Sequence, residues 1–98
     1  MSSELPRHLW TLLARMIWPG DHCWRVVLRQ GHGSDVVEFE RRFKSPDDVW
    51  DMPEEYPLAE IESMVALGYL SRRKSRHWIY YYWTKAGRRA VFDWSARA

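Results

Sequence analysis

The 98-residue sequence is long enough for one domain with its own hydrophobic core, and its formal net charge is only +2. Apolar residues make up 46% of the chain and aromatic residues 15%, which excludes an intrinsically disordered composition. The chain has one cysteine, no apolar run near the roughly 18 residues of a membrane-spanning helix and no secretory signal layout at its start, so we expect a soluble cytoplasmic protein without a disulfide or a membrane contact.

The first predicted element is a helix over Leu5–Trp18. Pro6 suits a first helical position, leucines recur at helical spacing, and a Pro-Gly pair follows the last turn. Residues 23–43 then alternate between apolar and polar side chains on both sides of a Gly-His-Gly-Ser turn, which predicts a two-stranded hairpin. A helix that begins at Ser34 also fits the apolar residues after the turn, so both interpretations stay open.

Two further helices are predicted in the middle of the chain. Ser45 starts a Ser-Pro-Asp-Asp sequence, which supplies a capping hydroxyl, a proline and two carboxylates to a helix start. That helix is short, because Pro53 follows soon after. The next helix begins near Pro57, carries apolar residues on one side and ends at Gly68 in a left-handed conformation.

The remaining residues predict a strand, a tight turn, a second strand and a last helix. Basic residues occupy 71–74, aromatic residues dominate 77–83, and Thr84 is suited to cap the helix that follows. A helix, two strands and a helix in this order are typical of a winged-helix domain.

Two motifs in this segment match a known family. The first is Leu67-Gly68-Tyr69-Leu70 followed by basic residues, and the second is Trp83-Thr84-Lys85-Ala86-Gly87-Arg88. The segment from Ile61 to Ala90 thereby resembles the end of MarR- and PadR-type winged-helix transcriptional regulators. The resemblance implies an α+β fold, with residues 1–98 forming a single winged-helix (helix-turn-helix) domain. It would carry an N-terminal β-hairpin insertion, a C-terminal wing hairpin and a final helix.

The resemblance also orients the aromatic strand. In these families a leucine points into the core at the position of Trp83, so Trp83 should point inward. Alternation along a strand then turns Tyr81 and Ile79 inward as well. It leaves three aromatic side chains on the outer face: Trp78, Tyr80 and Tyr82.

The charge of the chain is strongly segregated. Residues 46–67 hold seven acids and no lysine or arginine, whereas residues 68–98 hold eight bases and the single acid Asp93. Cations clustered on a wing would release counterions from a phosphate backbone, which predicts a small DNA-binding regulator with duplex DNA as its partner. The candidate nucleic-acid contacts are Arg72, Arg73, Lys74, Arg76, His77, Arg88 and Arg89.

A second hypothesis follows from the acidic segment. In the related families a recognition helix precedes the wing, and here the residues from Glu54 to Glu60 contain no base-reading cation. Phosphates would repel them, so the chain is alternatively a protein-binding inhibitor on a winged-helix scaffold, such as a phage-encoded anti-CRISPR or other anti-defence protein bound to a host protein complex. Its contact residues would be Trp78, Tyr80, Tyr82, Glu54 and Glu55. A homodimer is compatible with either hypothesis.

The sequence offers little catalytic chemistry. Its four histidines lack metal-ligand spacing, Cys23 has no second thiol, and the Gly-His-Gly turn lacks the lysine of a phosphate-binding loop. We therefore expect no enzyme activity, no catalytic residue, no cofactor and no metal site.

Overall fold

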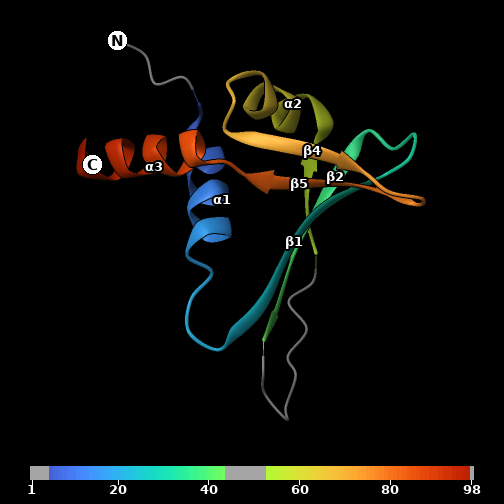
Figure 1. Ribbon diagram of the computed structural model, residues 1–98, viewed down its shortest axis with the longest axis horizontal. Helices are drawn as coiled ribbons and strands as arrows, with labels where there is room; N and C mark the ends of the chain where they lie inside the picture. Colours follow the sequence, from blue (N-terminus) through green and yellow to red (C-terminus); the bar gives the residue numbers. More distant parts are fainter. Residues whose placement is uncertain (1–4, 44–52, 98) are drawn as a thin grey trace.

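The computed structural model describes residues 5–43 and 53–97, apart from the side chain of Trp24. Five strands and three helices occur in these two ranges (Figure 1). In chain order they are α1 (Arg7–Ile17), β1 (Cys23–Gly31), β2 (Val36–Phe43), β3 (Glu54–Pro57), α2 (Leu58–Ala66), β4 (Leu70–Lys74), β5 (Trp78–Trp83) and α3 (Lys85–Arg97). The chain has the α+β class that the sequence predicts. The short helix predicted from Ser45 falls outside the described residues.

The strands form one antiparallel sheet in the order β3-β2-β1-β5-β4. β1 and β2 form the predicted hairpin, in which Leu28 pairs with Phe39. A hydrogen bond from the N–H of Ser34 to the carbonyl of Gly31, at 3.0 Å, closes the turn between them. The hairpin interpretation is therefore confirmed and the alternative helix from Ser34 is wrong, because β2 finds a strand partner on each of its two edges.

β1 also pairs with β5, which joins the two hairpins into one continuous sheet. Leu28 lies opposite Tyr81, and Gln30 lies opposite Ile79. The hydroxyl of Tyr81 donates to Oε1 of Gln30 at 2.8 Å, and Nε2 of Gln30 donates to the carbonyl of Ser34 at 2.6 Å. Because Tyr81 and Gln30 are both buried, these bonds satisfy polar groups that would otherwise be costly in the core.

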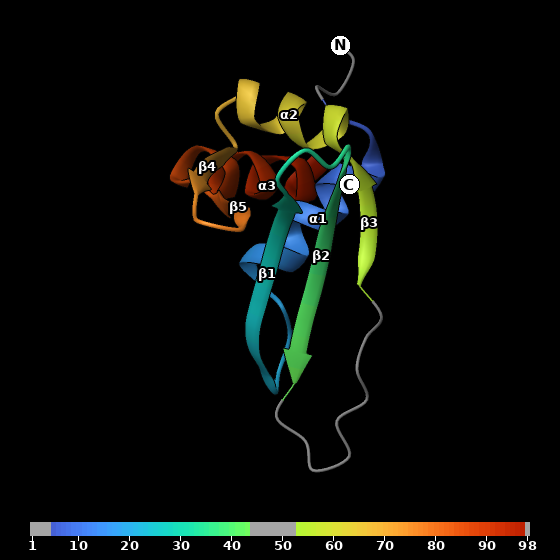
Figure 2. The ribbon, with the colours of Figure 1, turned by 90° about the vertical axis from the view of Figure 1, so that its right-hand side faces the viewer.

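Helices cover one face of this sheet. Figure 2 shows α1 and α3 behind β1, β2 and β3, whose opposite face is turned toward the viewer. α1 buries Leu9, Leu12 and Leu13, at the spacing that the sequence indicates. Trp10 stacks on Trp94 of α3 with ring centroids 5.7 Å apart and the rings almost parallel. We name the helix-covered side the inner face and the opposite side the outer face.

α2 begins directly after Pro57, close to the predicted start, and buries Ile61 in the core. Gly68 has a φ of 81° and follows the last turn in the left-handed conformation that the sequence predicts. The residues before α2 correct an expectation, because Glu54–Pro57 form β3 and not the start of a recognition helix. Pro57 explains the difference, since proline drives the residue before it toward extended conformations.

A close contact fixes α3 to the end of α2. Thr84 caps α3 as predicted, because the N–H of Gly87 donates to its Oγ1 at 3.0 Å. The same hydroxyl donates to the carbonyl of Gly68 at 2.6 Å, and the N–H of Thr84 donates to the carbonyl of Tyr69 at 3.1 Å. Gly87 is buried, and a Cβ at this position would overlap the carbonyl oxygen of Tyr69. The contact therefore requires glycine in the first turn of α3.

We expect Gly87→Ala to destabilise the protein by about 1–3 kcal/mol, since the added methyl group meets the main chain of Tyr69. At an open helical position the same change would instead stabilise by up to about 1 kcal/mol. Urea unfolding followed by circular dichroism measures the difference. The control is Ser95→Ala at an exposed position of the same helix, which should change the free energy of unfolding by less than about 0.5 kcal/mol. A more stable Gly87→Ala protein would contradict this packing.

Candidate functional site

A row of side chains on the outer face crosses all five strands. Residues paired across antiparallel strands share a face, so the register identifies the members of the row. From β3 to β4 they are Glu55, Glu38, Arg29, Tyr80 and Arg73. The row changes from acidic on β3 and β2 to aromatic and basic on β5 and β4. We name these parts the acidic half and the basic half of the outer face.

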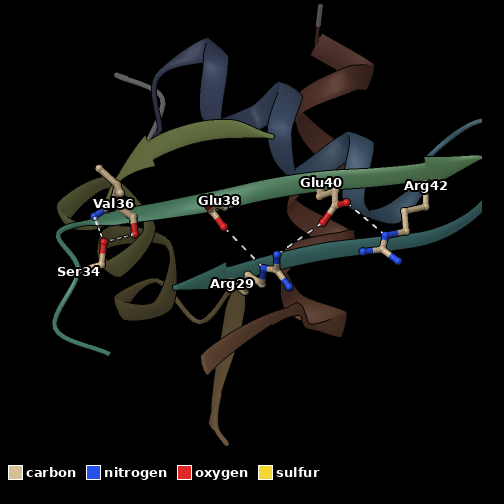
Figure 3. A network of polar contacts seen from close by, with 6 residues as sticks. All are labelled: Arg29, Ser34, Val36, Glu38, Glu40 and Arg42. Atoms are coloured by element: carbon tan, nitrogen blue, oxygen red, sulfur yellow. Dashed lines mark hydrogen bonds and ion pairs between the residues drawn. The ribbon is translucent and has the colours of Figure 1, made fainter. Parts of the chain in front are cut away.

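Arg29 lies in the middle of this row and forms ion pairs with two carboxylates of β2 (Figure 3). Its Nε lies 3.6 Å from Oε2 of Glu38 and its Nη2 lies 3.8 Å from Oε2 of Glu40. Nε of Arg42 donates to Oε1 of Glu40 at 3.2 Å, so two arginines face two glutamates. The guanidinium carbon of Arg29 also lies 4.2 Å from the ring centroid of Trp78 and covers that ring.

The turn between β4 and β5 presents exposed cations. We name residues 73–77 the hairpin tip. Within the described parts of the chain, four side chains of the tip are exposed and form no hydrogen bond, ion pair or ring contact: Arg73, Lys74, Arg76 and His77. Within residues 5–43 and 53–97, the three long side chains therefore have no acidic partner that would neutralise their positive charge.

Two hydrogen bonds anchor the hairpin tip. The N–H of Ser75 donates to the carbonyl of Trp78 at 2.8 Å and closes the turn. Nε2 of His32, from the turn between β1 and β2, donates to the carbonyl of Ser75 at 3.0 Å. Figure 1 shows both turns at the same end of the sheet. The cations therefore extend from a turn that is held by a neighbouring hairpin.

The structure does not bring the other three predicted cations to the tip. Arg72 lies on the inner face, with Nη1 4.0 Å from Oε1 of Glu62 on α2. Arg88 and Arg89 belong to α3 and lie beyond the far end of β5, whose six residues span roughly 20 Å. Figure 1 shows α3 and the hairpin tip extending in opposite directions. The guanidinium of Arg88 lies over the ring of Phe92, 5.4 Å from its centroid.

The aromatic strand alternates largely as predicted. Tyr81 and Ile79 are buried on the inner face, and burial raises the pKa of Tyr81. Trp78 and Tyr80 are half-buried on the outer face, whereas 49% of Tyr82 is exposed there. The rings of Tyr80 and Tyr82 lie side by side with centroids 6.5 Å apart. Arg29 covers the ring of Trp78. On the outer face of β5, the rings that remain available to a ligand are therefore those of Tyr80 and Tyr82.

Other aromatic residues are exposed where the sequence did not indicate it. Trp83 was expected in the core but is 40% exposed, because β5 ends there and Leu70, its cross-strand partner, fills the core at this point. Trp18 follows α1 and packs edge-on against Phe92 of α3, with ring centroids 5.0 Å apart. Both rings are about half exposed. Only the packing of α1 against α3 brings them together, so no local sequence signal identifies this pair.

A half-open pocket of about 210 Å³ lies between β1 and β5. It opens where the two strands diverge. Pairing between them extends from Gly31 only as far as Leu28, while β1 continues back to Cys23 and β5 turns into α3 after Trp83. The pocket is lined by Arg25, Val26, Val27, Leu28, Tyr80, Tyr81 and Tyr82. Sequence reasoning missed it because it depends on the register between distant strands.

The two glutamates proposed for protein binding have different environments. Glu55 is exposed on the acidic half of the outer face. Glu54 faces α1, and its Oε2 accepts hydrogen bonds from Nη1 of Arg15 at 2.8 Å and from the hydroxyl of Tyr56 at 2.9 Å. The hydrogen bond from Arg15 lowers the pKa of Glu54, and burial together with the bond to Glu54 raises the pKa of Tyr56 to about 12. Glu54 is therefore part of a contact between β3 and α1.

Within residues 5–43 and 53–97, no three His, Cys, Asp or Glu side chains lie close enough together to hold a metal ion. In the same ranges no helix combines the length and the apolar character needed to cross a membrane. Comparisons of the chain with protein-family models, curated proteins and solved structures find no match. Any function must therefore be inferred from the geometry of the chain itself.

The Arg15–Glu54 contact predicts a pH-dependent effect of Glu54→Gln. Because 45% of the Glu54 side chain is exposed, we expect a loss of less than about 1 kcal/mol at neutral pH. A lowered pKa means that the stabilisation is complete above the ordinary carboxyl value of 4.5 and is lost as the pH falls through the folded value. Urea unfolding should therefore show a difference from wild type at pH 7 that shrinks at about pH 3.

Glu55→Gln is the control for this experiment, because the exposed neighbour has no ion pair within the described residues. Its effect on the free energy of unfolding should be small at both pH values. A wild-type advantage over Glu54→Gln that stays constant between pH 7 and pH 3 would contradict the contact.

Proposed function

We propose that this protein binds nucleic acid by placing the hairpin tip on the phosphate backbone. The observation that supports this most strongly is the group of exposed cations on the anchored tip, above all Arg73, Lys74 and Arg76, which have no acidic partner among the described residues. Such cations release condensed counterions when they neutralise phosphates, and this supplies most of the affinity of sequence-independent binding. On β1 and β2, in contrast, carboxylates lie beside Arg29 and Arg42 and offset their charge.

We further propose that α2, β4, β5 and α3 correspond to the recognition helix, wing and last helix of a winged helix. The order of the elements and the bonds of Thr84 to Gly68 and Gly87 support this correspondence. In that arrangement α2 would face the major groove, yet its nine residues include Glu60 and Glu62 and no lysine or arginine. The contact with phosphates would therefore come from the tip, and the binding would depend little on base sequence.

The double variant Lys74→Ala/Arg76→Ala tests the proposed function. We expect wild-type binding to weaken steeply with salt, and the double variant to lower the slope of log K against log salt concentration by about 2. Fluorescence anisotropy with labelled DNA at several salt concentrations measures the slope. The matched control is Lys85→Ala/Arg89→Ala, which removes two exposed cations at the far end of β5. Absence of binding at low salt, or an equal loss in both variants, would contradict the proposal.

A second candidate function, binding to another protein, is favoured by the exposed Trp18–Phe92 pair. Aromatic and arginine side chains are enriched at protein interfaces, and Arg88 lies over Phe92. This surface would serve either an inhibitor of a host protein complex or a homodimer. It lies on α1 and α3, away from the hairpin tip (Figure 1). A partner that binds there would bind Lys74→Ala/Arg76→Ala and wild type equally well, which separates the two candidates.

A further inference from the structure

We propose that the pocket between β1 and β5 holds an unpaired nucleobase, so that the preferred ligand is single-stranded nucleic acid. This inference rests on the proposed function and specifies the class of nucleic acid. It begins from the pocket at the end of β5 that lies away from the tip. The pocket has a volume of about 210 Å³ and is open on one side, and Tyr80 and Tyr82 form one of its walls.

The tyrosine wall offers stacking surface. Half of Tyr82 is exposed, and its ring lies beside that of Tyr80 on the same face of β5. A base stacked on an aromatic side chain contributes about 1–3 kcal/mol, and any base can do this because each has a flat π face. In a duplex these faces are already occupied by neighbouring bases. A pocket that works by stacking therefore selects unpaired nucleotides.

The opposite wall offers polar groups. β1 forms this wall with Arg25 to Leu28, and its pairing with β5 begins only at Leu28. The main chain of Arg25 to Val27 pairs with β2 on one side. On the pocket side, it has no strand partner within the described residues. Backbone N–H and C=O groups at such an edge can bond the polar rim of a base. Val27, which is buried, supplies an apolar floor between them.

Arginine side chains flank the tyrosine wall on both sides. Arg73 lies opposite Tyr80 on β4, and the exposed Arg25 lies on β1 at the pocket. Within the described residues neither guanidinium forms an ion pair. The acidic half of the outer face begins one strand further, with Glu38 and Glu40. The cations beside β5 thus attract phosphates, whereas Glu38 and Glu40 offset the charge of Arg29 and Arg42 on β1 and β2. This difference directs a strand from the pocket toward the tip.

Binding of the full chain to an oligothymidylate of about 12 nucleotides and to a duplex of the same length tests this inference, with fluorescence anisotropy as the measurement. Wild type should prefer the single strand. Tyr82→Leu should weaken single-strand binding roughly 5- to 100-fold and leave duplex binding unchanged, because stacking is lost while the cations remain. Tyr82→Phe keeps the ring and should bind like wild type.

Trp83→Leu is the matched control, since Trp83 is the adjacent residue, is similarly exposed and lies on the opposite face of β5. Circular dichroism confirms that each variant is folded. The inference is overturned if Tyr82→Leu and Trp83→Leu have equal effects on the single strand, if Tyr82→Leu weakens duplex binding as much, or if wild type prefers the duplex. In each of these cases retained, salt-dependent duplex binding would leave the proposed function standing. Failure to bind either probe at low salt would reject both.

Discussion

The pairing of β1 with β5 determines what each face of the sheet presents. Its register is favoured by the buried hydrogen bond from Tyr81 to Gln30, because leaving either polar group unpaired in the core would cost about 1–3 kcal/mol. A shift of one residue would exchange the two faces of β5. It would turn Tyr81 to the solvent and bury Tyr80 and Tyr82. The composition of the core and the chemistry of the outer face therefore depend on the same few contacts.

The same register separates the charges on the outer face. It places Arg29 between the glutamates of β2 and the aromatic strand, so that Glu38 and Glu40 are paired within the protein. The cations of the hairpin tip receive no such partner within the described residues, and the bond from His32 to Ser75 holds them on a defined turn. A chain with a net charge of only +2 can thus present a localised positive surface.

Local sequence patterns predict the elements whose ends are marked by distinctive residues. Gly68 marks the end of α2 and Thr84 the start of α3, and alternation predicts the β1–β2 hairpin and most of β5. β3 was not predictable in this way, because Glu54–Pro57 contains two glutamates and a proline, which are uncommon in strands. It forms because β2 offers a free edge for pairing.

The candidate site was predictable only in part, because some of its contacts join strands that are distant in the sequence. The tip cations are consecutive or nearly so in the sequence, and a tight turn keeps them together. Arg88 and Arg89 follow within a dozen residues, but an extended strand carries them away from the tip. The pocket and the contacts of Arg29 require β1 to meet β5, and these strands are joined by residues that lie 51 positions apart, such as Gln30 and Tyr81. No local sequence pattern predicts the pairing of β1 with β5.

Backbone amide chemical shifts, followed by NMR while a short oligothymidylate is added, would locate the bound ligand on the folded chain. We expect the largest changes on β5 and the hairpin tip and at Arg25, with small changes on α2 and at the Trp18–Phe92 pair. The opposite pattern, with the largest changes on α2 or on the α1–α3 surface and an unaffected outer face, would contradict a nucleic-acid site built on the β1–β5 register.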